Sequence, residues 1–175
     1  MDLPQATIDD VIEQLTRARS EVSESIEVLR ASRGRVETDA PKFESPKAIL
    51  DYLDFFIGFF MSAAADLDHV IAELPASPSR AGVETLRQIA SNSSAEQRRC
   101  LMFRDKWINK PLAYEDVRPL LNQVSVDSRD QLTAFRNLNM AADHLDKLVA
   151  PRPAPPPPED GRLGRRALFT KWFGK

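Results

Sequence analysis

The sequence has little cysteine and little glycine, and it lacks the short motifs that mark most enzymes. Cys100 is the single cysteine, which excludes an internal disulfide and favours a reducing compartment. The six glycines are scattered, and none belongs to a GxGxxG or GxxxxGK phosphate-binding loop. The GxSxG, CxxC and Glu-x-x-His patterns are absent as well. We therefore expect a protein that is not an enzyme and that carries no cofactor.

No secretory signal is expected either, because the N-terminal stretch MDLPQATIDD has neither a basic region nor an apolar run. This favours a cytoplasmic protein. The overall charge of −2 hides a division of charge along the chain. Residues 1–150 hold 18 basic and 24 acidic side chains, whereas residues 159–175 hold five basic and two acidic ones. The sequence thus predicts an acidic body of one domain followed by a basic tail.

The segment Ala48–Leu74 is the most apolar long stretch of the chain. Its apolar positions recur at steps of three or four residues, which predicts a helix. The uncharged run from Phe55 to Ala65 has eleven residues, against about 20 for a membrane-spanning helix, so a central core helix is expected. A second, aromatic stripe consists of Tyr52, Phe55 and Phe59. It predicts that the helix buries more than one of its sides; the alternative is that the stripe forms a dimer face or a groove for a partner.

Three further helices are predicted around this one. The first runs from a capping box at Thr7 to about Ser32, with Gly34 as its terminator. Ser45-Pro46 and Ser77-Pro78 each start a helix, and the one that follows Ser77 extends to about Asn109, unless it breaks at Asn92–Ser94. The last runs from near Asp116 to Val149. Residues 1–150 are therefore predicted to form an all-α, antiparallel four-helix bundle.

A proline-rich linker follows the predicted bundle, in residues 151–160. The stretch PRPAPPPP has six prolines in eight positions and predicts a polyproline II spacer roughly 25 Å long. Arg152, Pro155 and Pro158 also match the spacing of an SH3 ligand, which is the alternative interpretation.

Residues 161–175 form the most informative segment. Five cations surround four large apolar side chains that would share an arc of about 140° on a helix. Cations around an aromatic face are typical of an interfacial membrane helix, although Arg165 interrupts the arc. The alternative is a peptide that docks on a partner protein or a compartment shell. The residues concerned are Arg162, Arg165, Arg166, Leu168, Phe169, Lys171, Trp172, Phe173 and Lys175.

Three weaker patterns have simpler explanations. Asp66, His69, Asp143 and His144 are candidate metal ligands at helix ends, but their spacing is not a metal signature, and capping or surface histidines are favoured. The basic run Arg98 to Lys110, with Phe103 and Trp107, is interpreted as a solvated face, and no nucleic-acid binding is expected. Cys100 falls on an apolar register and is expected to be buried and inert.

These features together predict an adaptor or scaffold protein. Its bundle would bind an unknown protein partner or form a homodimer, and its tail would attach it to an anionic surface at the inner face of a membrane. A metal-binding bundle that uses His69 and His144 is the minor alternative.

Overall fold

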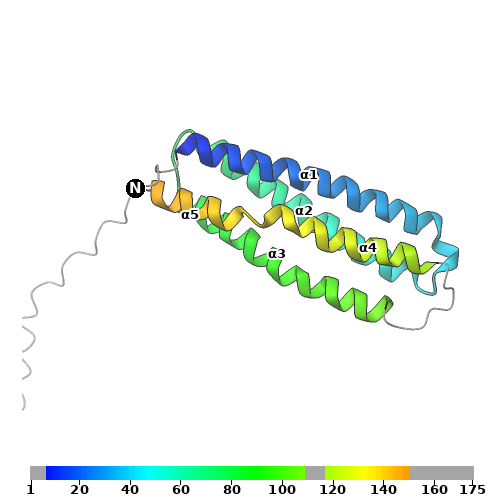
Figure 1. Cartoon of the computed structure of the whole chain (residues 1–175). Helices are drawn as coiled ribbons and strands as arrows, with labels where there is room; N and C mark the ends of the chain where they lie inside the picture. The colour runs from blue at the N-terminus through cyan, green and yellow to red at the C-terminus, as the bar shows by residue number, and fades with distance from the viewer. Residues whose placement is uncertain (1–6, 109–116, 150–175) are drawn as a thin grey trace, which may run out of the picture.

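The computed structural model describes residues 7–108 and 117–149. Within these ranges the chain is helical and contains no strand, so the prediction of an all-α helical bundle is confirmed. Figure 1 shows an elongated molecule in which consecutive long helices run in opposite directions. The elements are α1 (Ile8–Thr38), η1 (Ala40–Lys42), α2 (Pro46–Glu73), α3 (Arg80–Trp107), α4 (Arg118–Gln131), η3 (Leu132–Phe135) and α5 (Leu138–Leu148).

Helix α1 begins at the predicted capping box and ends later than predicted. The Thr7 hydroxyl accepts a hydrogen bond from the Asp10 amide at 3.2 Å, and the Asp10 carboxylate accepts one from the Thr7 amide at 2.7 Å. The predicted end near Ser32 is wrong, because the helix continues through Gly34 to Thr38. Val36 is fully buried, so burial of one more turn outweighs the glycine's low helix propensity.

Helix α2 starts at Pro46 directly after Ser45, as predicted, although the Ser45 side chain makes no capping hydrogen bond. The start predicted for α3 was two residues early: the helix begins at Arg80, and the cap is Ser79, whose hydroxyl accepts from the Gly82 amide at 3.1 Å. The proline at position 78 therefore precedes the cap instead of occupying the first turn.

Helix α3 is continuous, so the break considered at Asn92–Ser94 does not occur. The Ser94 hydroxyl donates to the carbonyl of Ala90 at 3.1 Å, and the Asn92 side chain accepts from Gln88 at 2.7 Å. The polar side chains thus find partners along the helix and leave its backbone ladder intact.

The interruption lies instead in the last helix, which was predicted to be continuous. Helix α4 gives way to the 3-10 segment η3, after which α5 resumes the same direction (Figure 1). Leu132, Phe135 and Leu138 are spaced by three residues, which is the period of a 3-10 helix. The tighter turn therefore keeps all three on the inner side of the bundle, where each is at most 3% exposed.

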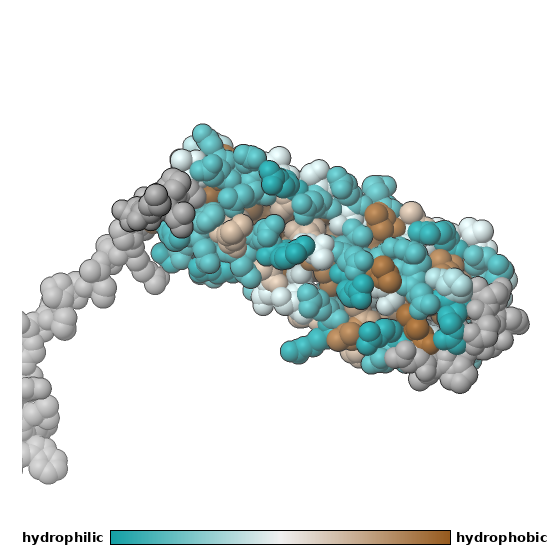
Figure 2. Space-filling view, viewed as in Figure 1, coloured by the Kyte–Doolittle hydropathy of each residue, from teal (hydrophilic) through white to brown (hydrophobic). Residues whose placement is uncertain are grey.

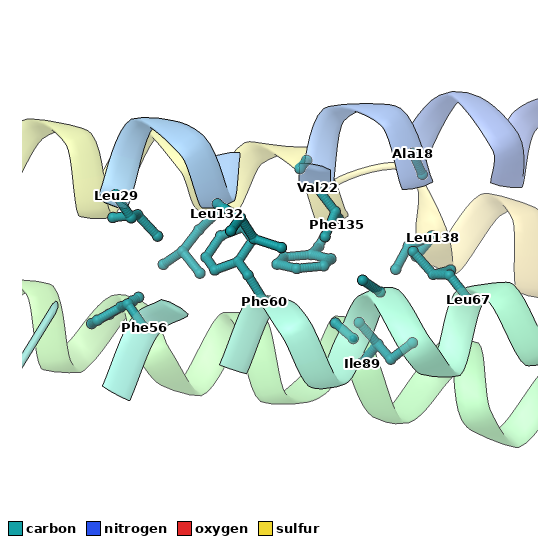
Figure 3. Close-up of a cluster of buried hydrophobic side chains, with 14 of the residues drawn as sticks. Ala18, Val22, Leu29, Phe56, Phe60, Leu67, Ile89, Leu132, Phe135 and Leu138 are labelled. Carbon is teal, nitrogen blue, oxygen red and sulfur yellow. The ribbon is translucent and has the colours of Figure 1, made fainter. Parts of the chain in front are cut away.

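The core is aromatic at its centre. Figure 3 shows Phe60 of α2 facing Phe135 of η3, and their ring centroids lie 5.0 Å apart. Leu29, Phe56 and Phe60 are fully buried, and each contributes roughly 1.5–3 kcal/mol of transfer free energy. Exposed ion pairs such as Arg19–Asp68 and Arg33–Asp54 join α1 to α2 but are worth about 1 kcal/mol or less each.

Helix α2 packs against α1 and also, through Tyr52 and Phe59 of its second stripe, against α3 and η3, as its wide apolar arc indicated. It has eight buried residues, the same number as α3, which is equally long. Among the described residues it is also the one helix that is long and apolar enough to cross a membrane, a test that a core helix passes too. Only a third of its most apolar window is buried inside the bundle, which leaves an unusual surface.

Candidate interaction surfaces on α2 and α3

The side of α2 that faces away from the core is uncharged at its centre. We call this side the outer face of α2. Its residues recur at steps of three or four positions and are all exposed: Lys47, Asp51, Phe55, Gly58, Ser62, Ala65, His69 and Ala72. Met61, beside it, is 50% exposed. Three turns of helix therefore meet solvent without a charge, in a chain of which 29% of residues are charged.

The three aromatic residues predicted as an interface occupy different surroundings. Tyr52 stacks on Phe103 of α3 with ring centroids 4.2 Å apart, and Phe59 meets the ring of Phe135 edge-on at 5.5 Å. Phe55 alone is exposed, at 38%, and the Arg99 guanidinium lies 3.8 Å from its ring centroid. Tyr52 and Phe59 thus contact other helices of the bundle, whereas Phe55 belongs to the outer face.

A groove of about 600 Å³ lies between α2 and α3, and we call it the α2–α3 groove. Tyr52, Phe103 and Trp107 provide apolar walls, and Arg98 and Lys106 supply cations at its edge. The Lys106 ammonium lies 5.1 Å from the centroid of the Trp107 indole.

The basic run of α3 is largely engaged in contacts within the chain. Arg99 binds Glu96 at 2.7 Å, and Phe103 is only 4% exposed because it stacks on Tyr52. The interleaved Phe103 ring therefore cannot serve as a platform on which nucleic-acid bases stack.

Cys100 is buried beside the Tyr52 hydroxyl, at 3% exposure. Burial raises the pKa of the Cys100 thiol and also that of the Tyr52 phenol. The thiol therefore stays protonated at neutral pH, and the prediction of a buried cysteine is confirmed.

The candidate metal ligands do not converge. His69 pairs with Glu73 at 3.2 Å, and the Nδ1 atom of His144 lies 3.4 Å from the side-chain nitrogen of Gln14. Asp143 binds Arg87 at 3.1 Å, and Asp66 is exposed. Within residues 7–108 and 117–149, no group of three or more histidine, cysteine or acidic side chains is placed to hold a metal ion.

One set of predicted residues lies outside this geometry, and one surface within it was not predicted. The tail residues from Arg162 to Lys175 and the linker lie outside the described residues. The outer face of α2, in contrast, was not predicted as a unit, because the aromatic stripe beside it is the more prominent pattern in the sequence. The signal was present in the uncharged run from Phe55 to Ala65, whose small residues fall on one side of the helix.

Comparisons with protein-family models, with curated proteins and with solved structures found no match to this chain.

Proposed function

We propose that this chain is a non-enzymatic adaptor. Its helical bundle holds a protein partner, and the basic amphipathic segment 161–175 attaches that bundle to an anionic membrane surface. The observation that carries the proposal is the division of charge: residues 1–150 have a net charge of −6, and residues 159–175 have a net charge of +3 with four large apolar side chains among the cations.

The expected attachment is weak and needs two contributions. Five cations near an anionic leaflet give at most about 1 kcal/mol each. Leu168, Phe169, Trp172 and Phe173, when partly buried in the interface, add roughly 1–2 kcal/mol each. Ordering the segment on the membrane costs a good part of this gain. The result is a reversible anchor that fails when either the charge or the apolar contact is removed.

The linker has a physical purpose in this scheme. The acidic bundle is repelled by the same lipids that attract the tail, and this repulsion decays over a Debye length of about 8 Å at physiological salt. A polyproline spacer roughly 25 Å long holds the tail several Debye lengths from the bundle. The tail can then approach the membrane while the acidic body stays clear of it.

Co-sedimentation with liposomes tests the proposal. We expect the full chain to sediment with vesicles that contain anionic lipid, to remain free with zwitterionic vesicles, and to detach as salt is raised. Changing Trp172 and Phe173 to Ala should abolish sedimentation, whereas Thr170→Ala, outside the apolar arc, should leave it nearly unchanged.

The same experiment distinguishes the competing function. If the full chain ignores anionic vesicles, but a tail peptide binds one defined protein with loss on the same two substitutions, the tail is a docking peptide for a protein partner or a compartment shell.

A further inference from the structure

No helix in the described part of the chain covers the outer face of α2, although Arg99 lies over the Phe55 ring and Arg30 reaches the Met61 sulfur. Phe55, Gly58, Met61, Ser62 and Ala65 are exposed side by side over three turns. The side of the bundle seen in Figure 2 is different, because its apolar residues are separate spots within a polar surface. Lone exposed apolar residues need no explanation, but a continuous uncharged helix face does.

Gly58 adds a second observation. A Cβ atom at this position would meet nothing within 4 Å, and its backbone is helical without a positive φ. A glycine in the middle of a helix costs about 1 kcal/mol relative to alanine. Neither a turn nor a close internal contact explains that cost, whereas close approach of a second helix backbone does.

We propose that the outer face of α2 packs antiparallel against the same face of a second copy of this chain. Consider an antiparallel arrangement whose two-fold axis lies at the level of residue 60. Each residue of one copy then lies opposite the residue of the other copy for which the two residue numbers add up to 120. Large side chains then lie opposite small ones, and oppositely charged side chains lie opposite each other at both ends of the contact. The pairs are Lys47 with Glu73, Asp51 with His69, Phe55 with Ala65, and Gly58 with Ser62.

The register also accommodates the remaining acidic side chains. Asp54 of one copy would face Asp66 of the other. Because Arg33 of α1 already binds Asp54, the repulsion between these two carboxylates is reduced. A parallel two-fold arrangement would instead oppose each residue to its own copy and set Asp51 against Asp51. Charge complementarity therefore selects the antiparallel dimer.

The size of the contact predicts its strength. From Lys47 to Glu73, the exposed residue that directly follows Ala72, the contact strip is 27 residues, or about 40 Å of helix, and a helix is about 10–12 Å across. Two such strips bury on the order of 900 Å² in total, close to the roughly 1,000 Å² expected of a specific interface. The dimer is therefore reversible and depends on concentration. This inference does not rest on the membrane proposal, although a dimer would carry two tails and bind a surface with higher avidity.

Sedimentation velocity of the full chain over a concentration series tests the dimer. We expect a monomer–dimer equilibrium that Gly58→Leu weakens at least about tenfold, because the new side chain would keep the helices apart. Gly34→Leu is the matched control: this glycine of α1 also has open space at its Cβ position but lies off the face, so the equilibrium should be unchanged. Circular dichroism of each variant checks that the fold is retained.

A charge exchange tests the register. Lys47→Glu alone and Glu73→Lys alone each place like charges opposite one another and should weaken the dimer, whereas the double variant should recover it. A chain that stays monomeric throughout the series, or a dimer that tolerates Gly58→Leu, overturns the proposal. A dimer weakened by Gly58→Leu but not recovered by the double exchange overturns the antiparallel register.

Discussion

Tyr52 of α2 stacks on Phe103 of α3, with ring centroids 4.2 Å apart and an interplanar angle of 27°. The stack joins α2 to α3, as does the contact of Arg99 with the Phe55 ring. The Tyr52 hydroxyl, however, is buried without a hydrogen-bond partner in the described part of the chain. The Ser128 hydroxyl beside it donates to the carbonyl of Val124 instead. The ring of Tyr52 therefore stabilises the bundle, whereas burial of its hydroxyl oxygen destabilises it.

Tyr52→Phe should leave the free energy of unfolding unchanged or raise it by about 1 kcal/mol, because it removes a buried polar atom that makes no hydrogen bond. Tyr52→Ala should lower it by about 3 kcal/mol, since the stack and its packing are lost. Urea unfolding followed by circular dichroism measures both. A substantial loss of stability in Tyr52→Phe would show that the hydroxyl has a partner.

Stability should fall at alkaline pH. Burial raises the pKa of Cys100 and Tyr52 in the folded chain above their ordinary values of 9.0 and 10.0. As pH rises, the unfolded chain therefore loses these two protons before the folded chain does. The contribution of the two groups to the free energy of unfolding is complete below about pH 9, and it declines as pH rises from the ordinary pKa values toward those of the folded chain. The decline approaches about 1.4 kcal/mol per pH unit for each group.

The unfolding free energy, measured between pH 7 and pH 11, tests this dependence. The double variant Tyr52→Phe, Cys100→Ala should have a clearly flatter profile above pH 9, because neither group remains to titrate. Equal slopes for the two proteins would mean that other groups cause the alkaline loss.

The sequence predicted most of the helical fold because the helices carry regular apolar spacing. Leu15, Val22 and Leu29 recur every seven residues and are all fully buried, and Phe56 and Phe60 are central, as their spacing indicated. The helix interruption was assigned to the wrong helix. The serines at 93 and 94 are poor helix formers, yet one is buried and the hydroxyl of the other donates to the carbonyl of Ala90. These outcomes depend on tertiary packing, which local propensity does not contain.

The candidate surfaces were predictable only in part. The aromatic stripe of α2 was identified, but its partners were not, because Phe103 and Phe135 are 51 and 76 positions away from Tyr52 and Phe59. Which side of α2 stays uncovered depends on how many helices pack around it. A sequence pattern fixes the arcs of a helix but not the number of neighbours that cover them.

A buried polar cluster between α1 and α4 should be important for stability. The Asp127 carboxylate, 7% exposed, accepts hydrogen bonds from the fully buried Ser32 hydroxyl and from the Gln123 side chain, the latter at 2.6 Å. Asp127→Ala should lower the unfolding free energy by about 1–3 kcal/mol, because the buried Ser32 hydroxyl loses its acceptor.

A double-mutant cycle with Ser32→Ala isolates the bond between α1 and α4. Because both single changes remove the same interaction, the double variant should cost less than the sum of the singles, with a coupling of about 1–2 kcal/mol. Strict additivity would indicate that the two side chains do not interact in solution.

The central claim is that the tail inserts its aromatic side chains into an anionic interface, and the fluorescence of Trp172 reports on this most directly. The chain has two tryptophans, so the measurement uses a Trp107→Phe background, in which Trp172 is the single emitter. Titration with vesicles that contain anionic lipid should shift the emission to shorter wavelength, and added salt should reverse the shift. Zwitterionic vesicles should produce no shift. An emission spectrum unchanged by anionic vesicles at low salt would contradict the account.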